Sequence, residues 1–292
     1  MAQRKLHSLE GIVALCALAF VLVLSVGFAR AADSAAEAQA TKVYLRSASA
    51  LVLDADSGEI VIDKNAEAVV PIASITKLMS AMVALDRGLD LQQRIVLADE
   101  DVDALKGTRS RLRTGAVLTR DQLLLLALMA SENRAAHALG RTYPGGLEAF
   151  VAAMNAKAAA LGMHDSRFVD PTGLSSANVS SARDLAKLVR AAHGYALIRD
   201  YSTRERASVS AYGRQVAFRN TNGLVHSAQW QIGLSKTGYI SEAGRCLVMQ
   251  VRLASKDLIV VLLDSWGKHS RIGDVNRIRK WLESKATAGR SS

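Results

Sequence analysis

The sequence predicts an α+β fold in which helices cover an antiparallel sheet and a mainly helical lobe is inserted into the chain. Runs rich in β-branched residues lie near both ends, at residues 49–64 and again after Tyr201. Between them, apolar residues at helical spacing dominate residues 91–197. The strands from the two ends must therefore form one sheet beside the helical insertion.

The first 46 residues predict an export signal and an alanine-rich leader. Two basic residues precede the uncharged apolar run Gly11–Phe28, and Ala29-Arg30-Ala31 is a small-x-small cleavage pattern. We predict a signal peptide over residues 1–31, a leader over residues 32–46 and a periplasmic mature protein. The apolar run is 18 residues long, just enough to span a bilayer, so an uncleaved anchor is the alternative.

Cysteine content limits how the mature protein is stabilised. Cys16 lies in the predicted signal peptide, which leaves Cys246 alone and excludes an internal disulfide. Cys246 stands in a strand pattern, and we interpret it as a small buried apolar side chain without a chemical role.

The charge of the chain favours an anionic partner. The formal net charge is +10, and the segment to Ala31 carries three basic residues and one glutamate, so the mature protein keeps +8. Nucleic acid is excluded as the partner because the chain is exported and has no basic cluster interleaved with aromatic residues. A carboxylate-rich polymer outside the cytoplasm fits, and the alternative is that dispersed charge only aids solubility.

The elements at the N-terminal side of the predicted domain are a hairpin and a helix. Two β-rich runs flank the turn cluster Ala55-Asp56-Ser57-Gly58, which predicts a hairpin over Ser49–Lys64. Pro71 then precedes apolar residues at helical spacing, so a helix should begin near Ala73 and end near Gly88.

The remaining elements complete one domain over residues 47–286, followed by a tail over 287–292. We place a sheet lobe at residues 47–90 and 200–286, and a helical lobe at residues 91–199. Helices are expected at residues 119–130, 146–162, 182–193 and 275–283, and strands at about 209–218, 231–240, 247–253 and 258–263. The last helix carries Ile278, Trp281 and Leu282 on one stripe, which indicates packing on the sheet rather than on a membrane.

Three short strings in chain order carry chemistry: Ser74-Ile75-Thr76-Lys77, Ser131-Glu132-Asn133 and Lys236-Thr237-Gly238. In the first, serine and lysine lie one helical turn apart, so their side chains can meet. Burial among apolar neighbours disfavours the ammonium form and pulls the lysine pKa toward neutrality, so a neutral amine can take the serine proton. A serine at a helix start also places backbone N–H groups beside developing negative charge.

The other two strings suit a substrate site. Ser131 and Asn133 follow an apolar helix directly and can present two polar side chains at a cleft floor, although a helix cap is the ordinary use of such residues. Lys236 and Thr237 can hold a carboxylate, while Gly238 on a strand edge lets a substrate backbone approach.

Each string alone is weak, because the chain contains a second copy of two of them. Ser176-Ala177-Asn178 lies in a loop rich in glycine and serine, and we interpret it as turn chemistry. Ser265-Trp266-Gly267-Lys268 follows a strand and contains glycine, which favours a turn over a helix start. Only the complete set in order is specific.

Taken together, the strings resemble the serine penicillin-binding proteins and β-lactamases. Four longer stretches narrow the resemblance to the low-molecular-mass D-alanyl-D-alanine peptidases of peptidase family S11, and most to endopeptidases of the penicillin-binding protein 7 type. These stretches are residues 71–79, 125–136, 170–174 and 219–222. The similarity runs from about Ser47 to Glu283.

The resemblance implies a DD-peptidase that acts on peptidoglycan stem peptides, with β-lactam antibiotics as covalent inhibitors and with no metal or organic cofactor. It implies these site residues: Ser74 as nucleophile, Lys77 as base, Ser131 as proton relay, Asn133 for the substrate amide, Lys236 with Thr237 and Gly238 for the terminal carboxylate, and the Tyr239 N–H as an oxyanion donor.

Three other activities remain open at this stage. In the resembling family, carboxypeptidases continue into a second domain, and the 54 residues after Gly238 favour an endopeptidase over a D-alanyl-D-alanine carboxypeptidase. A β-lactamase of this kind often uses a loop glutamate for deacylation, and none occurs between Glu148 and Glu205, so we expect a long-lived penicilloyl adduct. A non-catalytic peptidoglycan-binding module is the third alternative.

Overall fold

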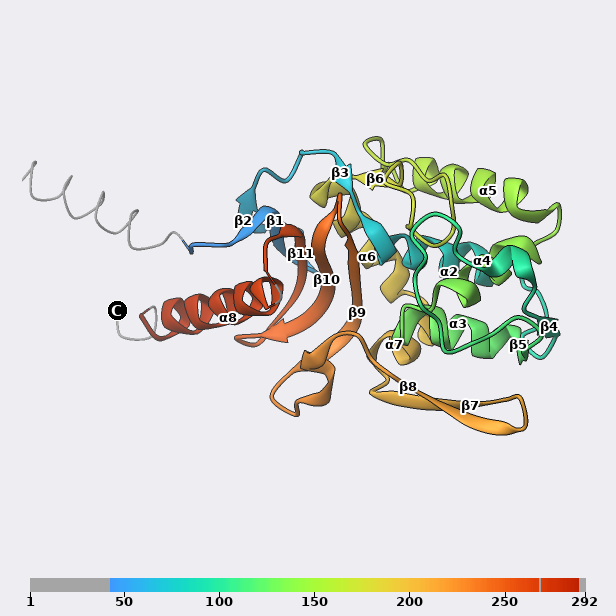
Figure 1. The fold of residues 1–292 in the computed structure, drawn as a ribbon. Helices are drawn as coiled ribbons and strands as arrows, with labels where there is room; N and C mark the ends of the chain where they lie inside the picture. The colour runs from blue at the N-terminus through green and yellow to red at the C-terminus, as the bar shows by residue number, and fades with distance from the viewer. Residues whose placement is uncertain (1–42, 268, 289–292) are drawn as a thin grey trace, which may run out of the picture. The chain divides into compact units, whose positions relative to one another are not determined.

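Strands from both ends of the chain form a five-stranded antiparallel sheet (Figure 1). In the computed structural model, which describes residues 43–267 and 269–288, the strand order is β2-β1-β11-β10-β9. The strands are β1 (Ser47–Asp54), β2 (Ile60–Lys64), β9 (Gln231–Ile240), β10 (Gly244–Leu253) and β11 (Lys256–Ser265). This confirms the predicted pairing of the two ends. The predicted signal peptide and residues 32–42 of the leader lie outside the described residues.

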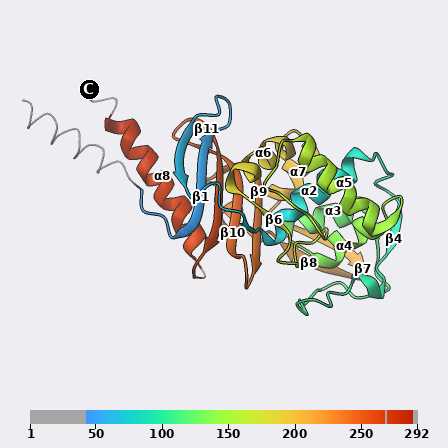
Figure 2. The same cartoon turned by 90° about the horizontal axis from the view of Figure 1, so that it is seen from above.

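Helices cover both faces of this sheet. Figure 2 shows α8 (Ser270–Ala288) on one side and α6 (Ala182–His193) on the other. The central strand β11 consequently buries every side chain from Leu258 to Leu263, as expected for a strand covered on both faces. Asp274 of α8 accepts hydrogen bonds from the backbone N–H and the hydroxyl of Ser47, at 2.8 and 2.6 Å, which fastens the last helix to the first strand.

The helix predicted at residues 73–88 begins differently from an ordinary α-helix. A single 3₁₀ turn, η1 (Ala73–Ile75), comes first, and α2 (Thr76–Asp86) continues from it. Helix α2 is buried from Thr76 to Ala84 because it packs among the other helices of the lobe. These are α3 (Arg120–Met129), α4 (Asn133–Arg141), α5 (Gly146–Ala160) and α7 (Ala196–Thr203).

The helical prediction was wrong for residues 91–118. They form a small hairpin of β4 (Arg94–Val96) and β5 (Val117–Thr119), joined by a long loop that contains the short turn η2 (Asp99–Asp101). The loop is fastened to the core by the buried residues Leu97, Leu112 and Ala116. These separate apolar residues account for the helical pattern on which the wrong prediction was based. A two-residue strand β6 (Val179–Ser180) pairs with β3 (Val70–Pro71), which directly precedes η1 in the sequence.

The predicted strand region 209–218 is a separate hairpin. Strands β7 (Arg206–Ala211) and β8 (Arg214–Arg219) pair only with each other among the described strands. Tyr212 and Gly213 join them with φ values of +56° and +70°, the pattern of a type I′ turn, which matches the right-handed twist of a hairpin.

The described residues contain no helix that combines the length and apolarity needed to cross a membrane. The boundaries of the two lobes, at residues 90 and 200, remain predictions.

Candidate active site

Ser74 and Lys77 meet at the start of α2. The Lys77 Nζ lies 2.9 Å from the Ser74 Oγ, because the turn η1 and the first turn of α2 place both side chains on one face. Ala73, just before the serine, has φ +47°, a left-handed conformation that costs a non-glycine residue about 1–3 kcal/mol. Strain of this kind concentrates at functional sites, where the surrounding fold holds it in place.

Burial controls the charge of Lys77. Its side chain is fully inaccessible to solvent, and this burial lowers its pKa to about 7, although the more distant carboxylates of Asp170 and Glu132 raise it. Near neutral pH, a large fraction of Lys77 is therefore the free amine that proton abstraction requires.

The other partners of Lys77 determine where its lone pair points. The Nζ also lies 2.7 Å from Asn133 Oδ1 and 2.6 Å from the carbonyl oxygen of Thr172. Both oxygens are acceptors, so a neutral Lys77 amine donates its two N–H groups to them. The lone pair is then left for the Ser74 O–H.

A second pair joins the sheet to the helical lobe. Lys236, on β9, lies 2.8 Å from the Ser131 Oγ and 2.9 Å from the Thr237 carbonyl oxygen. Lys236 is 1% exposed and has no carboxylate partner among the described residues. Burial first, and then the positive charges of Lys77 and Arg271, lower its pKa well below the ordinary value. An arriving carboxylate would supply the missing countercharge.

Glycine at position 238 lets β9 approach the nucleophile. A Cβ there would lie 2.9 Å from the carbonyl oxygen of Ile72 and 3.1 Å from the Ser74 nitrogen. From the sequence we expected this glycine to let a substrate backbone approach the strand. In the structure, it lets the strand approach the protein's own backbone at η1. Next to it, Tyr239 is 56% exposed, with its ring 4.7 Å from the guanidinium carbon of Arg245.

The polar side chains near Ser74 and Lys77 are held by neighbouring loops. Asn133 Nδ2 donates to Thr108 Oγ1 at 2.9 Å, which ties the first residue of α4 to the 98–116 loop. Thr237 Oγ1 lies 2.6 Å from Thr221 Oγ1, a residue of one of the four stretches that carry the family resemblance. Ser131 has φ +58°, so a strained turn presents it.

A loop that the sequence did not place in the site packs directly under Lys77. The Asp170 carboxylate accepts hydrogen bonds from the backbone N–H groups of Thr172 and Gly173, at 2.6 and 2.8 Å, and thereby shapes the turn whose carbonyl oxygen reaches Lys77. Gly173 has φ +78°, and a Cβ there would lie 1.9 Å from the Ala73 carbonyl oxygen. Only glycine allows this loop to rest on η1. The string Asp170-Pro171-Thr172-Gly173 was the feature of the sequence from which this loop could have been assigned to the site.

The two duplicate strings hold other positions in the fold. Asn178 of the first one packs against the Ser74–Lys77 string, where its Nδ2 donates to Thr76 Oγ1 at 3.1 Å. Asn178 is completely buried and hydrogen bonds to the 169–170 backbone, while Ser176 is exposed. Ser265 is buried and lies 2.5 Å, Oγ to Oγ, from Ser47 at the end of the sheet. Lys268 is outside the described residues.

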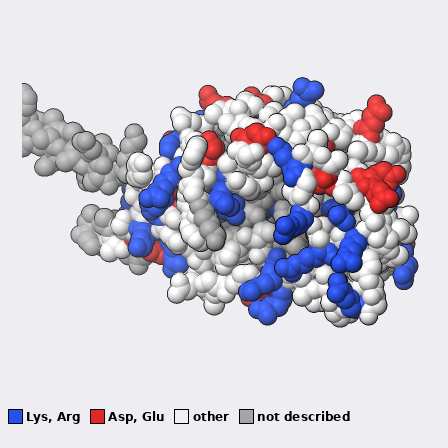
Figure 3. Space-filling view, viewed as in Figure 1, with Lys and Arg blue, Asp and Glu red and all other residues white. Residues whose placement is uncertain are grey.

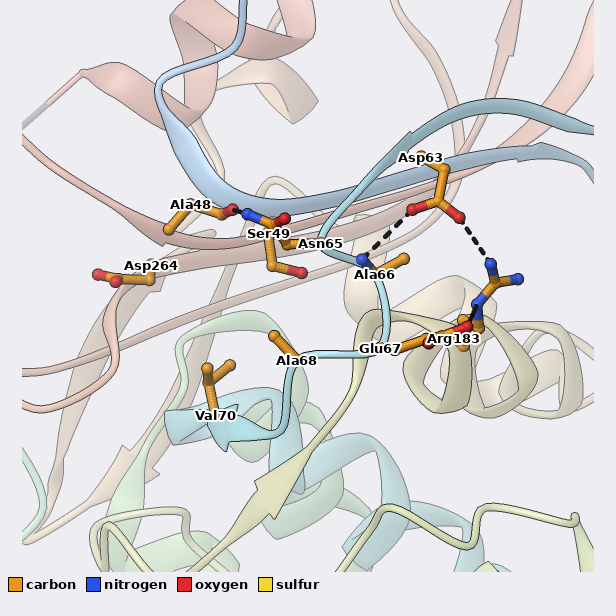
Figure 4. Close-up of a pocket in the computed structure, with 10 residues that line it drawn as sticks. All are labelled: Ala48, Ser49, Asp63, Asn65, Ala66, Glu67, Ala68, Val70, Arg183 and Asp264. Atoms are coloured by element: carbon orange, nitrogen blue, oxygen red, sulfur yellow. Dashed lines mark hydrogen bonds and ion pairs between the residues drawn. The ribbon is translucent and has the colours of Figure 1, made fainter.

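A hollow of about 540 Å³ lies apart from all the predicted site residues (Figure 4). It is enclosed by the first hairpin, the segment that follows it and Arg183 of α6, and Arg183 pairs there with Asp63 at 2.7 Å. The buried Ser49 hydroxyl at its wall has no hydrogen-bond partner in the described part of the chain. No residue of the three strings lines this hollow.

Comparison with known proteins places this geometry in a family. A family profile described as D-alanyl-D-alanine carboxypeptidase, peptidase S11, matches residues 34–267. The chain belongs to the peptidase S11 family. It is therefore a serine peptidase, and the predicted membership is confirmed.

Two relatives of this S11 peptidase are named D-alanyl-D-alanine endopeptidase. The protein from Pseudomonas aeruginosa is 48% identical over 242 residues, which is 82% of this chain and 78% of the relative. The one from Escherichia coli K12 is 43% identical over 274 residues, 93% of this chain and 88% of the relative. The crystal structure of the Streptomyces K15 DD-transpeptidase superposes with a TM-score of 0.77 at 26% identity, covering 84% of this chain and 99% of that one. This likeness confirms the predicted fold class.

Proposed function

We propose that this S11 peptidase hydrolyses the D-alanyl cross-link between peptidoglycan stem peptides through an acyl-enzyme on Ser74. The observation that carries the proposal is the 2.9 Å contact between the Ser74 Oγ and the Nζ of a completely buried lysine whose pKa lies near 7. The endopeptidase names of two relatives at 48% and 43% identity support this choice of scissile bond. Release of a terminal D-alanine by the same site is the second candidate.

Acylation begins with proton transfer from the Ser74 hydroxyl to the Lys77 lone pair. The Ser74 oxygen bonds to the carbonyl carbon of the cross-linked D-alanine, and the carbonyl oxygen becomes an oxyanion. The N–H groups of Ser74 and Tyr239 are proposed as its donors, because β9 and η1 lie against each other at Gly238. A pre-organised donor of this type contributes about 10²–10³ in rate.

Collapse of this intermediate breaks the C–N bond. The leaving amine takes up, through the Ser131 hydroxyl, the proton that Lys77 accepted from Ser74, so Lys77 returns to the free amine. Ser131 Oγ lies 2.8 Å from Lys236 Nζ. Asn133 orients the substrate amide, and Lys236 with Thr237 receives the carboxylate beside the scissile bond. Water then attacks the ester carbonyl, Lys77 accepts a water proton, and the Ser74 hydroxyl is regenerated.

We propose that the reaction takes place in the periplasm, where the polymer lies, after export by the N-terminal signal. Penicillin is expected to acylate Ser74 and remain bound, because the chain offers no loop glutamate between Glu148 and Glu205 to activate a deacylating water.

The test is digestion of purified cross-linked muropeptide dimers by the mature protein, residues 32–292, followed by mass spectrometry. Monomers are expected from wild type and no change from Ser74→Ala. Intact dimers lacking one alanine would instead establish carboxypeptidase action. Labelled penicillin should mark wild type and leave Ser74→Ala unmarked, and equal marking of both would remove Ser74 as the nucleophile.

A further inference from the structure

Six exposed arginines gather beside the cleft and are here called the basic surface. Three come from the 98–116 loop and three from the β7–β8 hairpin: Arg109, Arg111, Arg113, Arg206, Arg214 and Arg219. Figure 3 shows basic side chains concentrated over the β7–β8 hairpin and the part of the lobe next to it, with acidic side chains gathered at other positions on the same face.

None of these six arginines forms an ion pair with a carboxylate among the residues that the structure describes. Arg206 and Arg219 stand directly opposite each other in the β7–β8 register. Like charges at such positions destabilise a hairpin. Stability therefore gives no reason for this arrangement, whereas an external anion would relieve the repulsion.

The loop and the hairpin enclose a hollow of about 410 Å³ on this surface. Its lining comprises Arg111, Arg113 and Arg214, together with Ser110 and the β8 residues Gln215, Val216 and Ala217. Arg111 and Arg113 are exposed on either side of the buried Leu112. The Arg111 guanidinium donates to the Ala217 carbonyl oxygen and lies 5.8 Å from the Phe218 ring centroid, so it is held against β8, whereas the Arg113 side chain makes no hydrogen bond or ion pair among the described residues. The Tyr212 hydroxyl donates to the Arg113 carbonyl oxygen at 2.5 Å, so the tip of the hairpin is fastened to the loop and the hollow has fixed walls.

One hydrogen bond links the wall of this hollow to the turn that carries Ser131. Ser110, at its wall, donates to the Glu132 Oε1 at 2.6 Å. Glu132 stands between Ser131 and Asn133, the two predicted residues at the cleft floor. The loop that carries Arg109, Arg111 and Arg113 therefore contacts the Ser131–Asn133 turn at two points, because Thr108 Oγ1 also accepts a hydrogen bond from Asn133 Nδ2 at 2.9 Å.

We propose that the basic surface binds carboxylates of a peptidoglycan stem peptide beyond the scissile bond, which rests on the proposed function. Arginine suits this ligand, since its planar fork pairs with carboxylate in two parallel hydrogen bonds. An anionic membrane is the less favoured partner, because the outward face of the hairpin carries Ser208, Ser210 and Gln215 rather than large apolar side chains that could insert into lipid.

The test compares two double variants that each remove two positive charges. Arg113→Gln with Arg214→Gln alters the wall of the hollow, and neither side chain makes a hydrogen bond or ion pair among the described residues. The matched control, Lys256→Gln with Lys280→Gln, changes exposed lysines at the start of β11 and in α8. Binding to purified intact sacculi is measured in a Ser74→Ala background, so that it does not depend on hydrolysis.

The arginine variant should bind sacculi roughly fivefold to tenfold more weakly, whereas the lysine control should change binding less than about twofold. Sacculi whose carboxylates have been amidated should bind the starting protein and the arginine variant equally. In the enzyme with Ser74 intact, labelled penicillin should acylate both variants at the wild-type rate, which verifies their fold.

Equal sacculus binding by the two variants would overturn the proposal. So would unchanged sacculus binding by the arginine variant combined with weaker binding to vesicles of anionic lipid, which would assign the surface to a membrane. Failure of the wild type to cleave muropeptide dimers refutes only the proposed reaction, because the binding measurement requires no nucleophile.

Discussion

The Nζ of Lys236 lies 2.8 Å from the Oγ of Ser131, a contact between the edge strand of the sheet and a turn of the helical lobe that are 105 residues apart in sequence. Lys236 is buried, and the Thr237 carbonyl oxygen is its one other hydrogen-bond partner in the described part of the chain. The contact therefore couples the geometry of the two sides of the cleft. Any change that moves Ser131 also alters the environment of the buried Lys236 amine.

Replacement of Ser131 by alanine should lower the rate of acylation by labelled penicillin by about 10²-fold or more, the range for a lost proton-transfer group. Ser176→Ala is the matched control, because Ser176 starts the duplicate Ser-x-Asn string and is exposed. The control should react at the wild-type rate. If Ser176→Ala lost activity and Ser131→Ala kept it, the relay would belong to the other string.

The pH dependence of acylation should report the charge of Lys77. Its pKa is lowered to about 7, so the reactive amine accumulates as the pH rises, and the second-order rate constant should increase about tenfold between pH 6 and pH 8. The measurement is the acylation rate against pH, with circular dichroism at each pH to verify the fold.

Glu132→Gln identifies the group that titrates. The Glu132 carboxylate favours the ammonium form of Lys77, so its neutralisation should move the midpoint of the profile to lower pH. A midpoint that disappears in this variant would assign the titration to Glu132, whose own pKa is raised by burial. An unchanged midpoint would mean that the two charges are not coupled.

Gly238→Ala should impair acylation without unfolding the protein. The added Cβ would meet the Ile72 carbonyl oxygen at 2.9 Å and the Ser74 nitrogen at 3.1 Å, so β9 and η1 must separate by a few tenths of an ångström. Small displacements of reacting groups are costly, and we expect about a 10- to 100-fold slower reaction with penicillin. Gly223→Ala, where a Cβ meets nothing within 4 Å, should react normally. Equal rates for both variants would show that this approach is not needed.

The sequence predicted contacts best where they are local. Ser74 and Lys77 are three residues apart on one helical face, and this spacing alone led us to expect that their side chains meet. The strands at residues 231–240 and the helix at 182–193 also have the predicted bounds, because their apolar patterns are long and regular.

Contacts between distant segments were not predictable in this way. Thr172 is 95 residues from Lys77 and contacts it through a backbone carbonyl oxygen. Every residue has such an oxygen, so the side chains in the sequence do not indicate which one reaches Lys77. The helix prediction failed for the loop at 98–116 because its few buried apolar residues anchor irregular backbone rather than one face of a helix. The choice between Ser131 and Ser176 likewise depended on tertiary placement, which a string of three residues does not contain.

The Asn178 side chain should matter for stability, unlike Asn133, which lies in the cleft. Asn178 is completely buried, its Oδ1 accepts from the Val169 N–H at 2.7 Å, and its Nδ2 donates to the Asp170 carbonyl oxygen at 2.9 Å. Asn178→Ala leaves these backbone groups without partners, so the free energy of unfolding in urea should fall by about 2–3 kcal/mol. Because the same loop carries the Thr172 carbonyl oxygen that reaches Lys77, acylation by penicillin should slow as well.

Ser176→Ala, two residues away and exposed, should stay within about 0.5 kcal/mol of wild type. A stable Asn178→Ala protein with slow acylation would instead place Asn178 in the reaction, and wild-type values for both quantities would show that the loop keeps its shape without this side chain.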